Sequence, residues 1–497
     1  MKKLVAIVCA AALTFSVTGC GQTKEASVKQ LLSEKLAGEI TVSCYDTMGY
    51  KDFLQNAAKA FEKKNPGTKI KIETYAAMPE VKTSEIEGAT IAVMSSGDDT
   101  QERADYINKI NTELMSGEGA DVLAMDILPY YKYADGGQLE DLQAYMEADS
   151  KFDSSNYCKN VLDAMKYHGG QYIIPLDYHF NYMAYDSSLF TEAEQKNLQN
   201  HSITYNKLIK SAQEPFARVN ADSNDPIRMF GITEGSQMFR ELLSTDYAKY
   251  IDIENKKVHL TDGSFTKLLE EVKEYGQNGY LQPNSDSEEF SIEDFTLSKS
   301  KQPKIFYKSK ESYSLLEEAL KRAGSEASYS FSTDFGNESN DKILGLLTNA
   351  DEDINVDYFQ AYGINSNSDN KALSWAFIKF LLSEEIQAGQ EIALIGIPVN
   401  KAARSEKTQE DISGMTGMST EEASTQSKEL TEAQQKAYDY YLKSTEEFSA
   451  LLNHHSIKDD AIDNMIEKEV NKYFDGSESA DQVARTLQEK IELYLNE

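Results

Sequence analysis

Residues 40–72 alternate between strand and helix patterns, and this alternation constrains the fold more than any other feature of the chain. Ile40 to Tyr45 reads as a strand, and the helix that follows carries its apolar residues on one side: Phe53, Leu54, Ala57, Ala58 and Phe61. Asn65-Pro66-Gly67 ends this helix, and a second strand begins at Ile70. A strand–helix–strand unit predicts a parallel sheet with helices on its faces, so we expect an α/β fold.

The alternation recurs along the chain. We expect a helix over residues 103–115, strands at 121–125, 304–307 and 362–365, and a buried helix over 370–387 with Trp375 in the core. Residues 76–101 look irregular, and residues 200–300 mix short helices with turns. Residues 402–430 nearly lack large apolar groups, which predicts a mobile insertion before two closing helices. A chain of 497 residues is too long for one ordinary domain, so two lobes are expected.

The stretch from His168 to Phe190 combines extended and polar aromatic residues. Gly169-Gly170 permits a tight turn, and Pro175 interrupts an apolar run, which places that run at a sheet edge or a strand end. The polar aromatic residues 177–182 follow. We expect two short extended segments with a bend that lines a cleft, and an ordinary surface hairpin is the alternative.

The N-terminus has the form of a secretory signal. Lys2-Lys3 precedes a short apolar core, and Val17-Thr18-Gly19-Cys20 matches a bacterial lipobox. We therefore expect residues 1–19 to be a signal peptide, Cys20 to carry lipid, and residues 20–38 to be a tether. The protein would then sit on the extracytoplasmic face of the cell membrane. Plain secretion with an unmodified cysteine is the alternative.

The charge of the chain excludes one class of partner. The formal net charge is −32, and removal of Lys2 and Lys3 with the signal peptide makes it −34. Such a chain should be repelled by nucleic acid. The same charge leaves a cationic solute open.

Metal and cofactor motifs are missing from the sequence. Cys44 and Cys158 lie among apolar or aromatic neighbours, which favours buried free thiols over a disulfide. Residues 351–357 resemble the start of a calcium loop but have Val356 where glycine is needed. The adjacent His454 and His455 suit one metal poorly. No zinc, nucleotide or catalytic motif occurs, so we expect no metal, no cofactor and no catalytic residue.

Several separated stretches resemble, in order, the extracellular solute-binding protein family 1, the carbohydrate-binding receptors of ABC importers, similar in pattern to maltose-binding protein. They are FEKKNPGTKIKIE (61–73), INTELMSGEGADVLAMD (110–126), GGQLEDLQAYM (136–146), GGQYIIPLDYHFNYMAYDSSLF (169–190), YGINSNSDNKALSWAFIKFLLSEEIQ (362–387) and GIPVNKAA (396–403). The resemblance implies a periplasmic-binding-protein-like (type II) fold with two discontinuous α/β lobes and a ligand cleft between them. It divides the chain into 39–180 with 303–361 and 181–302 with 362–497, and it makes residues 177–182 the first crossing between the lobes.

The expected ligand contacts combine flat rings with polar groups that suit sugar hydroxyls. Strand ends and the following helix start contribute Tyr45, Asp46, Tyr50 and Asp126. The resemblance adds Tyr178 and His179 at the first crossing, Tyr307 and Lys308 near the second, and Gln237, Phe239 and Arg240 in the middle segment. Tyr45 could instead close the core, Asp126 could cap a loop, and His179 could be structural.

The resemblance implies a non-catalytic, monomeric receptor that captures a sugar or oligosaccharide and delivers it to an ABC permease. A receptor for a peptide, polyamine or organophosphate on the same scaffold is the second hypothesis. A secreted glycosidase with two carboxylates is the third.

Overall fold

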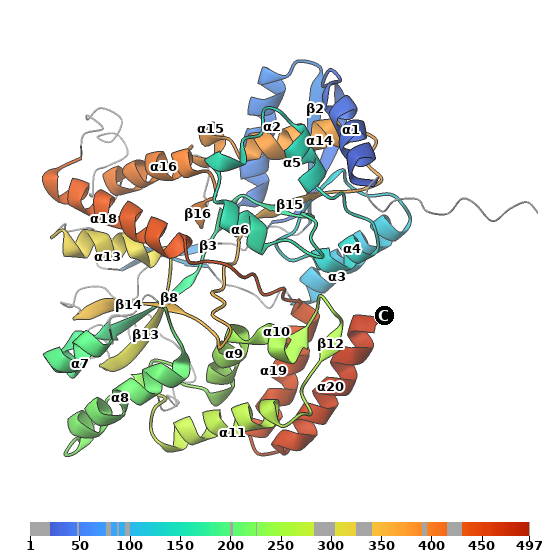
Figure 1. Ribbon diagram of the computed structural model, residues 1–497. Helices are drawn as coiled ribbons and strands as arrows, with labels where there is room; N and C mark the ends of the chain where they lie inside the picture. The colour runs from blue at the N-terminus through green and yellow to red at the C-terminus, as the bar shows by residue number, and fades with distance from the viewer. Residues whose placement is uncertain are drawn as a thin grey trace, which may run out of the picture.

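The fold is described by a computed structural model, which places residues 20–46, 49–75, 81–86, 89–94, 100–198, 202–224, 226–282, 304–324, 340–389, 395–414 and 430–496. Figure 1 shows two lobes, one above the other, each built around its own sheet. No helix in this described part of the chain is long and apolar enough to span a membrane. The predicted signal peptide lies outside the described residues.

The first lobe contains a five-stranded sheet of order β2-β1-β5-β15-β6, from β1 (Gly38–Tyr45), β2 (Thr68–Tyr75), β5 (Val122–Ala124), β15 (Ala361–Ile364) and β6 (Ile174–Pro175). Strands β2, β1 and β5 are parallel, as predicted, and β15 is antiparallel to β5. The predicted apolar face of α2 (Tyr50–Lys64) is buried. Pro175 lies in β6, at the sheet edge, where its missing N–H disrupts no ladder.

The other helices of the first lobe are α1 (Cys20–Leu32), α3 (Thr100–Met115), α4 (Tyr130–Asp135), α5 (Gln143–Ala148), α6 (Lys159–Ala164), α14 (Lys371–Leu381) and α15 (Glu384–Gln387). Trp375 in α14 is buried, as predicted, and its ring N–H donates to Asp149 at 3.0 Å. The predicted tether begins with α1, which contacts α5. Residues 76–101, predicted irregular, contain the hairpin of β3 (Val81–Ile86) and β4 (Ala89–Met94).

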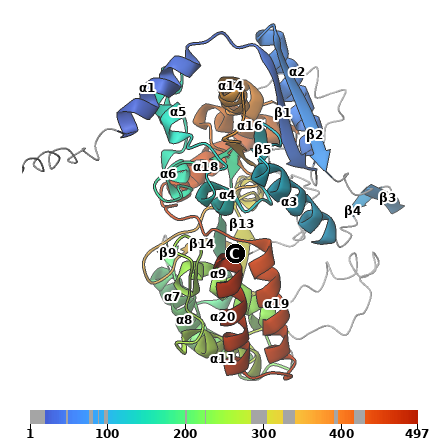
Figure 2. The ribbon, with the colours of Figure 1, turned by 90° about the vertical axis from the view of Figure 1, so that its right-hand side faces the viewer.

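The second lobe contains a sheet of order β10-β13-β8-β14-β9, from β10 (Arg228–Phe230), β13 (Ile305–Glu311), β8 (Asn181–Asp186), β14 (Asp341–Leu347) and β9 (Ser202–Ile203). Its other elements are α7 (Glu192–Asn197), α8 (Tyr205–Asn220), α9 (Gly235–Thr245), α10 (Tyr247–Tyr250), β11 (Ile251–Asp252), β12 (Lys257–Val258), α11 (Ser264–Gln277) and α13 (Ser314–Arg322). The closing helices α19 (Asp460–Phe474) and α20 (Ala480–Asn496) contact α9 and α11 of this lobe. Figure 2 shows them below α3 and α4 of the first lobe.

The predicted division of the chain between the lobes is wrong for its later segments. β13 and β14 pair with β8, so residues 304–347 belong to the second lobe rather than the first. β15 pairs with β5, so the segment that begins at residue 361 returns to the first lobe. Both lobes alternate strands and helices, and the sequence pattern does not specify which sheet a strand joins.

The predicted insertion over 402–430 begins as a packed helix. α16 (Lys401–Gly414) buries Ala403, Thr408 and Ile412, and it contacts α18 (Glu432–Ser449), which also contacts α13 of the second lobe. β16 (Ile397–Pro398), just before α16, pairs with β7 (Asp177–Tyr178). Residues 415–429 lie outside the described part. Cys44 and Cys158 are buried and free, as predicted.

Candidate functional site

The chain passes between the lobes three times, and the three crossings lie side by side. The first crossing is residues 176–180, the second is 348–360, and the third is 450–459. The His179 N–H donates to the Asp357 carbonyl at 2.8 Å, and the Asp357 N–H donates back at 2.9 Å. The Val356 N–H donates to the His454 carbonyl at 2.8 Å. These backbone bonds couple all three crossings into one narrow hinge.

A cavity of about 770 Å³ lies between the lobes against this hinge, and we call it the interlobe cavity. The first lobe contributes α3 and the loop that follows β5, and the second lobe contributes the start of α19 and the end of α20. Its polar and aromatic lining includes Arg103, Asn108, Asn111, Asp126, Tyr130, Lys132, Asp357, Tyr358, Lys458, Asp459, Asp460, Asp463, Asn464 and Tyr494. Both lobes and two crossings therefore face one space.

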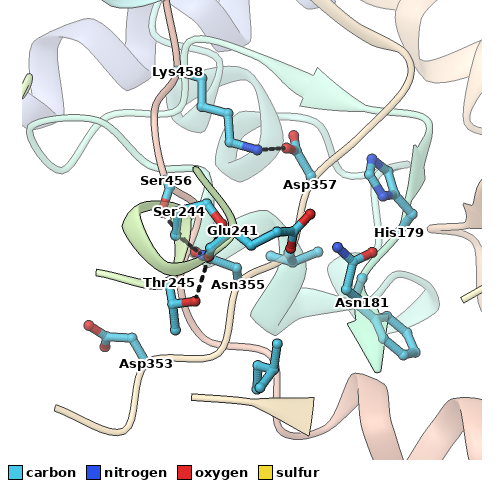
Figure 3. Close-up of a pocket in the computed structure, with 13 residues that line it drawn as sticks. His179, Asn181, Glu241, Ser244, Thr245, Asp353, Asn355, Asp357, Ser456 and Lys458 are labelled. Atoms are coloured by element: carbon cyan, nitrogen blue, oxygen red, sulfur yellow. Dashed lines mark hydrogen bonds and ion pairs between the residues drawn. The ribbon is translucent and has the colours of Figure 1, made fainter. Parts of the chain in front are cut away.

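A smaller cavity of about 110 Å³, the hinge cavity, shares Asp357, Ser456 and Lys458 with the interlobe cavity. Figure 3 shows His179 and Asn181 on one side of it and Glu241 of α9 near its centre. This space is far smaller than a ligand pocket for a drug-sized molecule. Of these two cavities, only the interlobe cavity falls within the usual size range of a small-molecule site.

The charged pair at the boundary of the two cavities joins the second and third crossings. The Lys458 ammonium donates to the Asp357 carboxylate at 3.1 Å (Figure 3). Burial alone would raise the pKa of Asp357, but Lys458, His455 and His179 outweigh it and hold the pKa at about 2. The carboxylate is therefore ionised at neutral pH and fixes Lys458 in the cavity wall.

The loop after β5 presents polar groups that lack partners. Among the described residues, Oδ1 of Asp126 and the hydroxyl of Tyr130 are buried and have no hydrogen-bond partner. Tyr130 is only 3% exposed, so water does not replace the missing partner freely. Burial raises the pKa of Asp126 to about 7, although Arg103 lowers it. This corner of the cavity can pair with a hydroxyl or an ammonium group.

Polar contacts join the lobes along one side of the interlobe cavity. Arg103 of α3 pairs with Asp460 of α19 at 2.6 Å, and Tyr131 of α4 donates to Asp459 at 2.7 Å. The Lys132 ammonium lies 3.5 Å from the centre of the Tyr494 ring. Helix termini of both lobes thus meet beside the cavity.

Three of the predicted contact residues lie at this site or touch it. Asp126 lines the interlobe cavity. His179 lines the hinge cavity, stacks on Phe359 at 4.2 Å, and has a pKa lowered by burial, although Asp357 opposes the shift. The Tyr50 hydroxyl donates to the Phe359 carbonyl at 3.4 Å and so braces the second crossing.

Three other predicted residues of the first lobe and its crossing line neither cavity. Tyr45 is 1% exposed and packs with Tyr75 and Tyr106, the core role that was the alternative. Asp46 is buried, and its carboxylate accepts from the Lys51 N–H at 3.3 Å. Tyr178 is fully buried, and its hydroxyl pairs with Ser449 at 2.6 Å. Their side chains stabilise the fold and the hinge rather than line either cavity.

The predicted contacts from the second lobe also lie elsewhere. Phe239 packs against Phe265, and Tyr307 bonds Ser211 and the Leu208 carbonyl inside the lobe. Lys308 pairs with Asp341 at 2.9 Å, and Arg240 pairs with Glu467 at 2.8 Å. Gln237 is exposed and lines neither cavity. Glu241, next to Arg240 on α9, lines the hinge cavity instead, because adjacent helical residues face different directions.

The third crossing and the start of α19 contribute several cavity-lining residues that the sequence did not predict. Lys458, Asp459, Asp460 and Asp463 all come from the run 454–464, which reads HHSIKDDAIDN. Its polar composition between two long helices is the one signal that could have marked it. The described residues hold no group of three or more metal-ligating side chains, so the two histidines there form no metal cluster.

Comparison with known structures gives the fold a context. A family 1 extracellular solute-binding protein from Alicyclobacillus acidocaldarius matches with a TM-score of 0.57 at 16% identity, over 94% of this chain and 100% of that chain. An ABC substrate-binding protein from Listeria monocytogenes, in complex with cycloalternan, matches with a TM-score of 0.53 at 16% identity, over 93% and 100%. The sugar-binding protein MalE from Xanthomonas citri matches with a TM-score of 0.55 at 14% identity, over 92% and 98%.

At these identities the likeness concerns the fold, which is the predicted two-lobed, periplasmic-binding-protein-like (type II) arrangement. The family profile described as bacterial extracellular solute-binding protein matches residues 47–388, more than half of the chain. The chain therefore belongs to the bacterial extracellular solute-binding protein family.

Proposed function

We propose that this protein is the substrate-binding lipoprotein of an ABC importer, and that it captures a sugar or oligosaccharide and delivers it to the membrane permease. The observation that carries the proposal is the interlobe cavity, which takes its walls from both lobes and from the hinge. A solute held there contacts both lobes and so stabilises the closed arrangement. The proposal includes a monomeric receptor without catalytic residues.

The chemistry of the cavity suits a polyhydroxylated solute. Carboxylate, amide and hydroxyl groups from Asp126, Asn108, Asn464 and Tyr130 can pair with sugar hydroxyls, and the Tyr358 and Tyr494 rings offer flat apolar surface. The cycloalternan complex and the sugar-binding MalE among the structural relatives support the same substrate class.

A melting-temperature screen with mono- and oligosaccharides, peptides, polyamines and organophosphates tests the solute class. A solute present at 100 times its Kd stabilises the folded state by about 2.7 kcal/mol, so a specific sugar should raise Tm clearly. Stabilisation by a peptide or an organophosphate alone would refute the sugar assignment. Turnover of a glycoside in a time course would refute the receptor function and favour a glycosidase.

The lipid anchor at Cys20 is a separate part of the proposal, supported by the lipobox that precedes it. Full-length protein expressed in a bacterium should incorporate labelled palmitate and partition with membranes. Cys20→Ser should abolish both results and leave the folded domain intact. Equal labelling of the two proteins would refute the anchor.

A further inference from the structure

The interlobe cavity carries more acidic than basic side chains. Its walls hold Arg103, Lys132 and Lys458 against five aspartates: Asp126, Asp357, Asp459, Asp460 and Asp463. A count of this kind does not define a site, because paired carboxylates need no further cation. The question is which of the five already have a partner.

Three of the aspartates are engaged with the protein itself. Asp460 pairs with Arg103, and Asp357 pairs with Lys458. Asp459 accepts from the hydroxyls of Tyr131 and Tyr494 and from the N–H groups of the first turn of α19. These interactions satisfy the acids at the rim and at the hinge.

The other two, Asp126 and Asp463, have no basic group within ion-pair distance among the described residues. Asp126 comes from the first lobe and leaves Oδ1 buried without a partner. Asp463 comes from α19 of the second lobe, and its carboxylate accepts a 3.4 Å hydrogen bond from the Tyr247 hydroxyl. One carboxylate without an ion-pair partner among the described residues therefore faces the cavity from each lobe.

The electrostatic cost of this arrangement is visible in both groups. Burial raises the pKa of Asp126 to about 7 and that of Asp463 to about 6, even though Arg103 and Lys458, respectively, act in the opposite direction. A cation brought into the cavity would lower the cost of ionising both carboxyls.

A separate observation shows that the corner beside Asp126 is built to receive a ligand group. The Tyr130 hydroxyl is buried at 3% residue exposure, lines the cavity and has no hydrogen-bond partner among the described residues. A buried polar group without a partner is costly, so it usually marks a position that water, an ion or a ligand fills.

We propose that the solute is an amino-bearing saccharide whose ammonium groups pair with Asp126 and Asp463, while its hydroxyls pair with Tyr130 and the amides of the cavity. This inference rests on the sugar-binding function proposed above and narrows its substrate class. The unpaired carboxylates favour a cation over a neutral sugar, and they repel uronic acids. The hydroxyl and amide groups favour a saccharide over a plain polyamine.

The test compares probes that differ mainly in charge: chitobiose with free amino groups, N,N′-diacetylchitobiose, cellobiose, digalacturonate and spermidine. Each is titrated into the protein by calorimetry in low salt at pH 7, because the raised pKa of Asp126 leaves its carboxyl largely neutral at pH 6. We expect chitobiose to bind at least about tenfold more tightly than its acetylated form and cellobiose, and digalacturonate to bind least. Equal affinity for chitobiose and cellobiose would overturn the inference but leave the sugar-binding function standing. Binding of spermidine alone would overturn both.

Substitutions in the cavity test which residues cause the preference for chitobiose. Asp126→Asn and Asp463→Asn should each reduce the preference for chitobiose over cellobiose severalfold, because each removes one carboxylate without changing side-chain size. Asp105→Asn, an exposed position on α3 outside the cavity, is the matched control and should keep the full preference. A preference that survives in both cavity variants would overturn the assignment of these residues. If a variant does not fold, the affinities of wild type for chitobiose and for its acetylated form still show whether the site prefers an ammonium group.

Discussion

Asp177 and Asp126 both hold carboxylate oxygens away from water, and they differ in what surrounds them. Asp177, in the first crossing, accepts from the backbone N–H groups of Phe359 at 3.0 Å, Gln360 at 3.1 Å and Gly396 at 3.3 Å. Asp126, in the wall of the interlobe cavity, leaves one oxygen without any partner among the described residues. Burial raises the pKa of both, to about 6 and about 7 respectively, and the backbone bonds limit the rise for Asp177.

The difference separates a structural carboxylate from one that is available to a solute. Asp177 ties the first crossing to the second and to the segment before β16, so its full set of bonds holds the hinge together. Oδ1 of Asp126 accepts no hydrogen bond from the described residues, so it can accept one from a molecule in the cavity. The two roles are distinguished by whether the protein itself supplies hydrogen-bond partners to the carboxylate, and not by burial or pKa alone.

Asp177→Ala should produce the largest loss of stability. It leaves three backbone N–H groups, two of them in buried hydrogen bonds, without an acceptor, which should cost about 3–5 kcal/mol of the free energy of unfolding. Asp126→Ala should cost less than about 1 kcal/mol, since no hydrogen bond from the protein to Oδ1 is lost. Chemical denaturation at pH 7 measures both values. Equal losses would remove the distinction between the two carboxylates.

The pH dependence of stability sharpens the comparison. The folded-state pKa of Asp126 is raised above its ordinary value, so the folded state holds this proton more tightly than the unfolded state does. Its contribution is fully present below about pH 4 and is lost as pH rises to about 7. Asp126→Asn removes the titrating carboxyl, so the variant does not lose this stability as the pH rises. The variant should therefore gain on the order of 1–2 kcal/mol relative to wild type between pH 5 and pH 7.

Asp177 and Asp463 titrate in both proteins, so the difference between wild type and variant isolates Asp126. Denaturation midpoints across this pH range measure it. If the difference in unfolding free energy between the two proteins stays constant from pH 5 to pH 7, the Asp126 carboxyl is not a group whose charge lacks partners in the folded state.

Two tyrosine hydroxyls extend the comparison to uncharged groups. The Tyr178 hydroxyl pairs with Ser449 at 2.6 Å inside the hinge, so Tyr178→Phe should cost about 1 kcal/mol of stability and leave solute affinity nearly unchanged. Tyr130→Phe should leave stability unchanged or slightly higher and should weaken solute binding. Paired melting and calorimetric measurements test this. A reversal of the two patterns would show that the hinge and cavity roles are wrongly assigned.

The smallest effect is expected at the exposed rim of the cavity. The Arg103 and Asp460 side chains are 29% and 45% exposed, so their ion pair should contribute at most about 0.5 kcal/mol. Arg103→Ala should reduce stability by no more than this amount, and salt should diminish the difference. A loss of several kcal/mol, comparable to that of Asp177→Ala, would show that this contact between the lobes is structural.

The sequence predicted the local elements of the first lobe well. The strand–helix–strand unit from residue 40, the edge position of Pro175 and the burial of Trp375 all follow from periodicity and backbone restrictions that act over short distances. The assignment of β13, β14 and β15 to a lobe failed, because strand pairing joins residues more than 100 positions apart. Periodicity carries no information about such partners.

The site was less predictable than the fold. Asp126 was found because a polar residue at the end of a buried strand faces the sheet edge where ligands bind. Tyr45 was expected in the cleft as an aromatic residue at a strand end, and Phe239 and Tyr307 because of the family resemblance, but all three rings fill the core. The third crossing was missed, since nothing in its polar sequence distinguishes a hinge segment from an ordinary loop.

The most direct test of the account is a crystal structure of the protein with the saccharide that stabilises it most. We expect density in the interlobe cavity, in contact with Asp126 and Tyr130 of the first lobe and with α19 of the second. A saccharide bound elsewhere, with Asp126 and Tyr130 still without partners and solute contacts confined to one lobe, would contradict it.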